Sequence, residues 1–198
     1  NTAVPLEIGG KNVTETLQQM LNDRGHNFST FSQKEIVRNI KEKHCYLSSD
    51  YENEIKKEEK FINYSLPDGN VIQLGNEIFR SSEILFNYNV NGFESKGICE
   101  ILFESIEKCD EKIRNDLCSN IVVSGGTTKL NGFIERLEKE INKHATNGID
   151  AKIIEPHRRQ FASWIGGSIL SALPTFKGMM VSSQEYNESG SSIVRKCP

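Results

Sequence analysis

A glycine pair at the end of an apolar run is the feature of this sequence best suited to chemistry. Residues 120–123 are followed closely by Gly125, Gly126, Thr127 and Thr128. Such a turn exposes backbone N–H groups, and ligands of open α/β sheets bind beyond the carboxyl ends of the strands. The position therefore suits a nucleotide, although the spacing matches neither GxGxxG nor GxxxxGK(S/T). A plain tight turn is the alternative.

Charged residues offer two further candidates. Lys41 and Glu42 are adjacent near the end of an amphipathic helix, and the run His157 to Gln160 follows Pro156. From the residue types alone, the first is a solvated pair and the second a polar loop. The four histidines are too scattered for a metal triad, and the sequence contains no GxSxG or HExxH motif. The residues therefore predict neither a metal site nor a catalytic nucleophile.

The elements that would position these residues begin with helices. Apolar residues recur at helical spacing early in the chain, at Val13, Leu17, Met20 and Leu21. A capping box of Ser32 and Glu35 predicts the start of a second helix. The charge-dense segment 52–60 is predicted to be a solvated helix face or loop.

A hairpin is predicted next. Residues 64–66 and 71–74 flank Pro67 to Asn70, where Asp68 and Gly69 would supply the positive φ angles of a tight turn.

The middle of the chain predicts a β–α–β unit. Residues 86–95 are expected to form a loop, and helices are expected over 97–108 and 110–119. The run 120–123 is predicted to be a strand covered on both faces, and 151–154 a second strand. The helix between the strands carries its apolar face on Phe133, Ile134, Leu137 and Ile141.

The last forty residues predict one apolar helix and a short capped one. The first lies around 165–173 and contains Gly166 and Gly167, each of which costs about 1 kcal/mol against Ala in a helix. Close packing or a groove is the expected reason for them. A capping box at Ser182 and Glu185 precedes an exposed tail.

Composition excludes several classes of function. The 24 Lys and Arg residues nearly balance the 27 Asp and Glu residues, which argues against a general nucleic-acid binder. No apolar run approaches the length of a membrane-spanning helix, and residues 1–10 lack the pattern of a signal peptide. The five cysteines form an odd set without a CxxC pair, which favours free thiols in a reducing compartment. We therefore expect a cytoplasmic protein.

Long stretches of the sequence resemble the actin family. VVSGGTTKLNGFIERLEKEI (122–141), KIIEPHRRQFASWIGGSILSALPTFKGM (152–179) and SSQEYNESGSSIVRKC (182–197) look strongly like the C-terminal half of actin. Asp23 to His26, KEIVRNIKEKHCY (34–46) and LPDGNVIQLGNEIFR (66–80) resemble the part of actin before it. The similarity runs nearly end to end with one short gap in the charged segment, and it begins about halfway along a typical member.

The resemblance implies an α/β fold. Actins enclose ATP and a divalent cation between two domains of ribonuclease-H-like topology. This chain would supply the C-terminal half of that actin-like ATPase fold. Residues 1–8 and 94–161 would form the inner α/β subdomain, and 9–93 a small inserted outer subdomain. Residues 162–198 would pack on the N-terminal domain.

The resemblance also implies a nucleotide site. Arg38, Lys41 and Glu42 would approach the ribose and base. The phosphate and sugar side would be lined by Gly125, Gly126 and Thr127, and the adenine flanked by Lys129 and Leu130. Two positions depart from the family: Lys129 stands where actins usually have Met, and Gln160 where they usually have Lys.

Other family parts do not match any residue of this chain. Both phosphate-binding hairpins, with the Asp and Gln that hold the metal and position the attacking water, belong to the other half. The resemblance therefore implies ATP or ADP with Mg or Ca in an intact protein. This chain alone is expected to bind none of them and to have no catalytic residue, because in-line attack needs those groups.

A partner groove carries over as well. Its residues resemble the hydrophobic groove at the barbed end of actin: Ile165, Ile169, Leu170, Leu173, Thr175 and Met179. In actin this groove receives helices of regulators and a loop of a neighbouring subunit, whereas some of these side chains could simply face the core. Pro174 within the groove helix and Pro198 in place of the usual terminal Phe leave the groove's geometry open.

Three readings of function remain at this point. The first is part of an ATP-binding cytoskeletal protein that forms or regulates filaments, with actin-like subunits and actin regulators as partners and neither nucleic acid nor membrane. Its plug loop, 86–95, is more polar than usual, so the protein is expected to polymerise poorly or only with partners. The second is an interaction module with a degraded nucleotide site, and the third a sugar kinase or chaperone ATPase of the same superfamily. By itself, the chain should self-associate through apolar surface.

Overall fold

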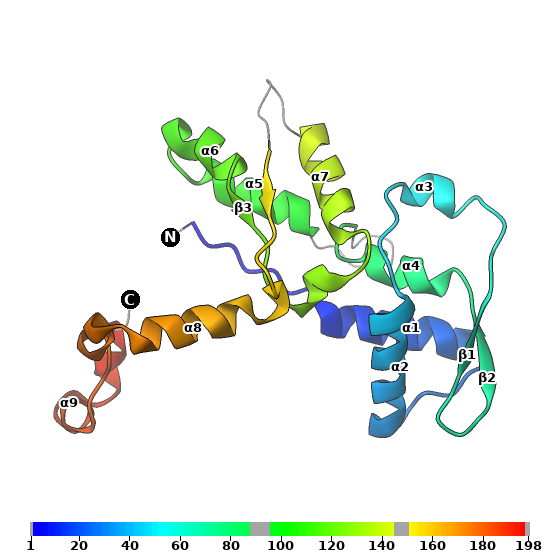
Figure 1. Ribbon diagram of the computed structural model, residues 1–198, viewed down its shortest axis with the longest axis horizontal. Helices are drawn as coiled ribbons and strands as arrows, with labels where there is room; N and C mark the ends of the chain where they lie inside the picture. Colours follow the sequence, from blue (N-terminus) through cyan, green and yellow to red (C-terminus); the bar gives the residue numbers. More distant parts are fainter. Residues whose placement is uncertain (1, 88–95, 145–150, 197–198) are drawn as a thin grey trace.

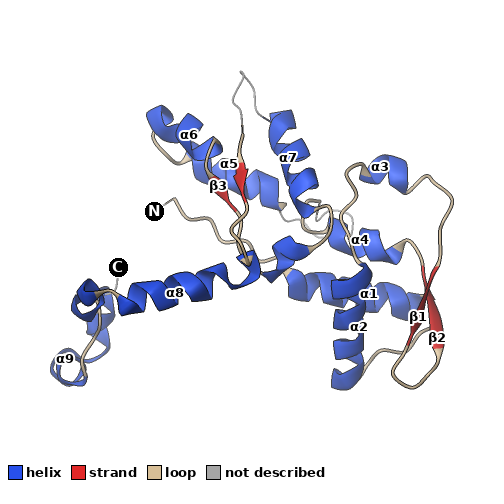
Figure 2. Ribbon diagram, in the orientation of Figure 1, coloured by secondary structure: helices blue, strands red, loops and turns tan. Residues whose placement is uncertain are grey.

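The computed structural model describes residues 2–87, 96–144 and 151–196. They form a body of helices and two small sheets, with the β1–β2 hairpin at its outer edge, and a helical arm projects from the opposite side (Figure 1). Figure 2 shows that helices dominate and that the strands are short. Residues 88–95, most of the predicted plug loop, lie outside the described residues.

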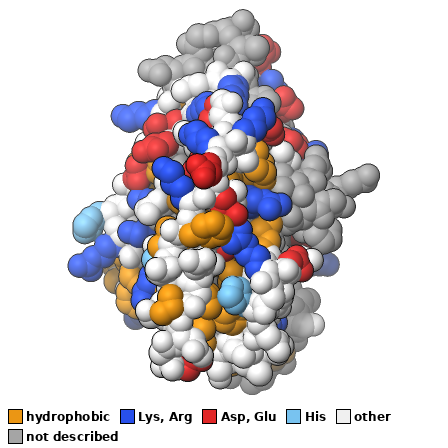
Figure 3. Space-filling view, turned by 90° about the vertical axis from the view of Figure 1, so that its right-hand side faces the viewer, with side chains coloured by type: hydrophobic (Ala, Val, Ile, Leu, Met, Phe, Trp, Pro, Cys, Tyr) orange, Lys and Arg blue, Asp and Glu red, His pale blue; other side chains and the backbone are white. Residues whose placement is uncertain are grey.

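The first part of the body holds four helices and a hairpin. Its elements in chain order are α1 (Gly10–Asp23), α2 (Phe31–His44), α3 (Tyr51–Glu54), β1 (Ile62–Ser65), β2 (Val71–Leu74) and α4 (Glu77–Glu83). The predicted stripe of α1 is confirmed at Val13, Leu17 and Leu21, which are fully buried, whereas Met20 is only partly buried. Helix α4 was not predicted from the sequence. Figure 3 looks at this side of the molecule and shows side chains of both charges mixed with apolar ones.

The start of α2 differs from the prediction. Thr30 is the N-cap: its hydroxyl accepts from the N–H of Gln33 at 3.3 Å, and Gln33 Oε1 accepts from the N–H of Thr30 at 2.9 Å. The predicted capping box of Ser32 and Glu35 is therefore wrong. The same Ser/Thr-x-x-Glu/Gln pattern occurs twice, two residues apart, and the helix begins at the earlier copy.

The predicted hairpin is confirmed, with a different turn. Strands β1 and β2 are antiparallel, with Ile62 opposite Leu74 and Ser65 opposite Val71. Gly69 has φ +88°, whereas Asp68 is not among the residues with positive φ. Asp68 instead accepts a hydrogen bond from the N–H of Asn70 at 3.0 Å. The prediction was therefore right for the glycine and wrong for the aspartate.

The second part of the body contains the predicted β–α–β unit. Its elements are α5 (Ile98–Glu107), α6 (Glu111–Cys118), β3 (Ile121–Val122), the 3-10 turn η2 (Gly126–Lys129), α7 (Phe133–His144) and β4 (Ile153–Ile154). Strands β3 and β4 are parallel, with Ile121 opposite Ile153. Phe133, Leu137 and Ile141 of α7 are buried in one cluster with Ile121 and Val123.

Strand β3 is covered on one face, not on both as predicted. Ile121 and Val123 are buried, while Val122 between them is 61% exposed. Side chains alternate along a strand, so one face packs against the helices and the other has no cover from the described residues.

The arm consists of helices without a core. It contains η3 (Arg159–Phe161), α8 (Ala162–Ala172), η4 (Pro174–Gly178), α9 (Ser183–Ser189) and η5 (Gly190–Lys196). The predicted capping box at Ser182 is confirmed, but Pro174 begins η4 and does not lie in α8. No arm side chain that the structure describes is buried, and a Cβ at Gly166 or Gly167 would meet no atom within 4 Å. The close packing expected at these glycines is absent from the described chain.

Two further expectations concern chemistry and membranes. Cys45, Cys99, Cys109 and Cys118 are free thiols, as predicted, and Cys197 lies outside the described residues. Within the described ranges, no helix has both the length and the apolar content to cross a bilayer.

Candidate functional site

A hollow of about 610 Å³ lies between α2, the turn η2 and the start of the arm. Every residue that the sequence analysis assigned to a nucleotide lines it, except Gly125. The lining residues are Arg38, Lys41, Glu42, Cys45, Gly126, Thr127, Lys129, Leu130, Asn131, Gln160 and Phe161. The volume is in the range typical of small-molecule sites. Cys45, Asn131 and Phe161 are additions that no pattern in the sequence indicated.

Lys41 is held in a fixed position on one wall of the hollow. Its Nζ donates to the carbonyl of Gly10 at 2.9 Å and to Thr14 Oγ1 at 3.0 Å. Its half-buried position lowers the pKa of Lys41, because burial disfavours the charged amine. Glu42 accepts from Arg38 Nε at 2.9 Å instead. The prediction that Lys41 and Glu42 form a solvated pair is therefore wrong for Lys41.

Thr127 joins the opposite wall to the start of α1. Its Oγ1 accepts a hydrogen bond from the N–H of Gly10 at 3.1 Å. The approach is close, since a Cβ built on Gly10 would lie 2.9 Å from that same oxygen. Gly10 thus contacts both Thr127 and Lys41 and fixes the distance between the two walls.

The glycine pair plays two different parts. Gly125 has φ +101°, a conformation that L side chains rarely adopt. At Gly126 a Cβ would meet no atom within 4 Å, so the backbone there faces open space. Gly126 and Thr127 begin η2, and the first N–H groups of a helical turn have no acceptor within it. They can donate to a ligand in the hollow.

Gln160 adds a polar atom that calls for a partner. Its Oε1 is buried and has no hydrogen-bond partner among the described residues. A buried amide oxygen is costly to leave unpaired, so a ligand with an N–H or O–H group would stabilise it. Together with the N–H groups of η2 and the amine of Lys41, these donors and acceptors fit a nucleotide. A divalent cation has no comparable set: no group of three or more His, Cys, Asp or Glu residues gathers in the described part of the chain.

Arg159 lies behind η2 rather than in solvent. Its guanidinium donates to Thr128 Oγ1 at 3.1 Å and to the carbonyl of Thr128 at 3.0 Å. The side chain is only 20% exposed. The polar loop expected for His157 to Gln160 is therefore wrong at Arg159.

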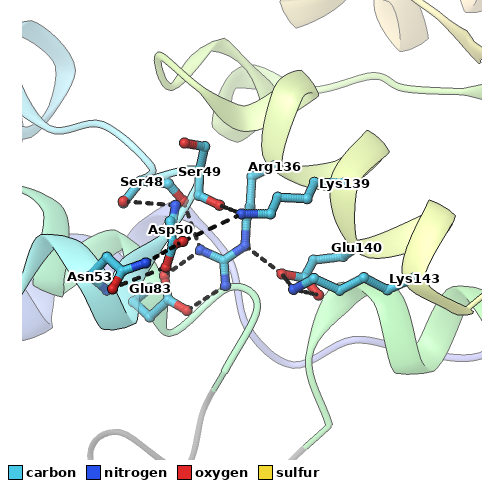
Figure 4. Close-up of polar contacts among 9 residues, drawn as sticks. All are labelled: Ser48, Ser49, Asp50, Asn53, Glu83, Arg136, Lys139, Glu140 and Lys143. Atoms are coloured by element: carbon cyan, nitrogen blue, oxygen red, sulfur yellow. Dashed lines mark hydrogen bonds and ion pairs between the residues drawn. The ribbon is translucent and has the colours of Figure 1, made fainter.

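A buried ionic junction fixes the two walls relative to each other (Figure 4). Arg136 on α7 pairs with both carboxylate oxygens of Glu83 at the end of α4, at 2.8 and 3.0 Å. It also donates to the carbonyl of Ser48, in the segment that follows α2, at 2.8 Å. Glu140 accepts from its Nε at 2.8 Å, so four of the five N–H donors of the guanidinium have partners. One side chain thereby links α7, α4 and the continuation of α2.

The six residues assigned to a partner groove lie along the arm. Ile165 lines a hollow of about 450 Å³ with Arg158, Phe161 and Trp164. The other five have exposed side chains: Ile169, Leu170, Leu173, Thr175 and Met179.

The family model described as Actin matches residues 4–198. The match therefore covers both walls of the hollow, the junction and the arm.

Proposed function

Because the chain belongs to the actin family, we propose that it is part of an actin-like, ATP-binding cytoskeletal protein that forms or regulates filaments. Membership of the family implies the actin-like ATPase fold. Residues 1–8 and 94–161 would form its inner subdomain, 9–93 the outer one and 162–198 the C-terminal segment. The buried cluster around α1 and α2 lies entirely within residues 9–93, which supports an outer subdomain there. The cluster around α7 also takes in Val13, Leu47 and residues 84–86 of that range, so the two parts share a core.

The observation that carries the proposal is the hollow between α2 and η2. Residues far apart in the sequence, such as Arg38, Gly126 and Gln160, meet there. Chance would not be expected to place nearly all the residues assigned by resemblance around one hollow. Its open backbone at Gly126 and the unpaired oxygen of Gln160 are both features that a ligand would explain.

Each wall would contribute a different contact. The N–H groups at the start of η2 would bind phosphate or ribose oxygens. Lys41 would supply positive charge, held in place by Gly10 and Thr14. Gln160, Lys129 and Leu130 would border the base. The bound triphosphate supplies a phosphoanhydride bond, and these residues bind and orient it without breaking it.

Hydrolysis is not proposed for this chain. Phosphoryl transfer needs a positioned water and a metal-held phosphate, and the family residues that provide them match no position here. The same proposal places the protein in the cytoplasm as part of the cytoskeleton, with actin-like subunits and regulators as partners. The groove residues of the arm would be their contact surface.

A substitution at Gly126 tests the nucleotide site. Gly126→Val would place a side chain in the hollow, where the protein itself offers no clash. We expect the affinity of the intact protein for ATP, measured by calorimetry, to fall by about tenfold or more while its melting temperature stays unchanged. Gly178→Val is the matched control. A Cβ at Gly178 also meets no atom within 4 Å, but Gly178 lies on the arm and does not line the hollow.

Two results would contradict the proposal. Equal ATP affinity in the Gly126→Val and wild-type proteins would remove the hollow as the site. A wild-type protein that binds no ATP at millimolar concentration would favour the interaction module instead.

Filament formation is tested separately by pelleting of the intact protein, where the polar plug segment 86–95 predicts short or partner-dependent filaments.

A further inference from the structure

We propose that Arg159 is a positioning residue for nucleotide binding, holding the turn η2 in the shape that presents Gly126 and Thr127 to the ligand. This inference rests on the proposed nucleotide site and adds a residue that lines no part of the hollow. Gly125, Thr128 and Arg159 are joined by a closed ring of hydrogen bonds.

The ring is built from both the backbone and the side chain of Arg159. The N–H of Gly125 donates to the carbonyl of Arg159 at 2.9 Å. The guanidinium donates to Thr128 Oγ1 and to the carbonyl of Thr128. The hydroxyl of Thr128 then donates to the carbonyl of Gly125 at 2.8 Å, which closes the ring. Both ends of the turn are thereby tied to one residue.

The local backbone is arranged to allow this double contact. Arg158 has φ +57° and is the non-glycine residue with positive φ in the described chain. Such a conformation costs free energy in a residue with a side chain, so the surrounding contacts must stabilise it. Here the reversal lets the carbonyl and the guanidinium of Arg159 both reach the turn.

The guanidinium is fixed from its outer side as well. Arg159 Nη1 donates to Glu155 Oε2 at 2.6 Å, and Glu155 is itself 43% exposed. Thr128 is buried, so its carbonyl and hydroxyl depend on protein partners. Removal of the guanidinium leaves that buried carbonyl without its donor, and the turn would relax to pair it elsewhere. The N–H groups of Gly126 and Thr127 would move with it.

The test compares Arg159→Met, Arg159→Lys and wild type in the intact protein, with ATP as the probe. We expect Arg159→Met to weaken ATP binding by about tenfold, the equivalent of one or two lost hydrogen bonds. Arg159→Lys should recover much of the affinity, because an ammonium can still donate to the Thr128 carbonyl. Thr128→Val should weaken binding too, and adding it to Arg159→Met should cause little further loss, since both act through one ring.

Arg114→Met is the matched control. Arg114 on α6 also holds backbone carbonyls, those of Cys109 at 3.1 Å and Glu107 at 2.6 Å, but these belong to the end of α5 and the turn after it. Its loss should leave ATP affinity unchanged. Equal weakening by Arg114→Met and Arg159→Met, or unchanged affinity in Arg159→Met, would overturn the inference while wild type still binds ATP. If wild type binds no ATP, the proposed function fails and this inference fails with it.

Discussion

At the scale of single residues, the chemistry of this chain is set by burial more than by residue type. Burial raises the pKa of the Cys45 and Cys99 thiols to about 12. The thiolate is the reactive form, so these cysteines are protected twice, by their protonation and by their position. Lys41 shows the opposite direction, a pKa lowered by burial, because its charged form is the protonated one.

The cysteines give a prediction about reactivity. At pH 8 the raised pKa reduces the thiolate fraction by about a thousandfold relative to an ordinary thiol. We therefore expect Cys45 and Cys99 to be alkylated by iodoacetamide far more slowly than the half-buried Cys109. Mass spectrometry of the peptides after timed labelling measures this. Unfolding in guanidinium should abolish the difference, and fast labelling of Cys45 in the folded protein would contradict the assigned burial.

Residue patterns in the sequence indicated the hollow but not the hydrogen bonds that fix its walls. The glycine pair was recognisable because a strand that ends in Gly-Gly exposes its backbone. Lys41 and Arg159 were interpreted as solvated residues, since nothing in a local run of charges shows that the chain returns to bury them. Their partners, Thr14 and Thr128, are 27 and 31 residues away.

At the scale of elements, those whose apolar residues recur at regular spacing were predicted from the sequence. Helix α4, which lacks such spacing, was not. The stripe of α1 and the strand–helix–strand order around α7 were both recognisable. Helix α4 was not, because its seven residues include two serines and two buried glutamates. The cause of its burial lies elsewhere in the chain, where Arg136 neutralises Glu83.

The contact between α4 and α7 leads to a prediction about stability. Breaking a buried ion pair on one side leaves an uncompensated charge, which costs about 3–5 kcal/mol. We expect Arg136→Met to lower the free energy of unfolding by that amount in urea titrations. The double variant Arg136→Met with Glu83→Leu should lose less than the two single losses combined, since it leaves no orphaned charge.

An exposed pair provides the control for that experiment. Lys108 pairs with Glu104 one helical turn earlier on the surface, with 46% of the lysine side chain exposed. Lys108→Met should therefore change stability by about 0.5 kcal/mol or less. A similarly small effect of Arg136→Met would show that the junction does not hold α7 to α4.

At the scale of the whole molecule, the arm stands out because its apolar side chains are exposed. Its apolar side chains include Trp164, 76% exposed, and Ile169, 62% exposed. Gly166 and Gly167 weaken α8, yet no described residue packs against them, because a Cβ at either position would meet no atom within 4 Å. The outer face of β3, with Val122, is likewise uncovered by described residues. An apolar surface of this kind is typical of regions that contact another chain or domain.

This surface predicts the behaviour of the 198-residue chain on its own. Burying exposed apolar side chains stabilises association by about 25 cal/mol per Å², so the chain should self-associate as its concentration rises. Light scattering over a range of concentrations should give an average mass that climbs above 22.4 kDa. Trp164→Ser with Ile169→Ser should shift the rise to higher concentration by about tenfold or more, since two large side chains leave the contact. Phe31→Ser is the control, because Phe31 is 81% exposed on α2 and away from the arm. A monomer at every concentration, or an equal shift with Phe31→Ser, would show that the arm does not drive association.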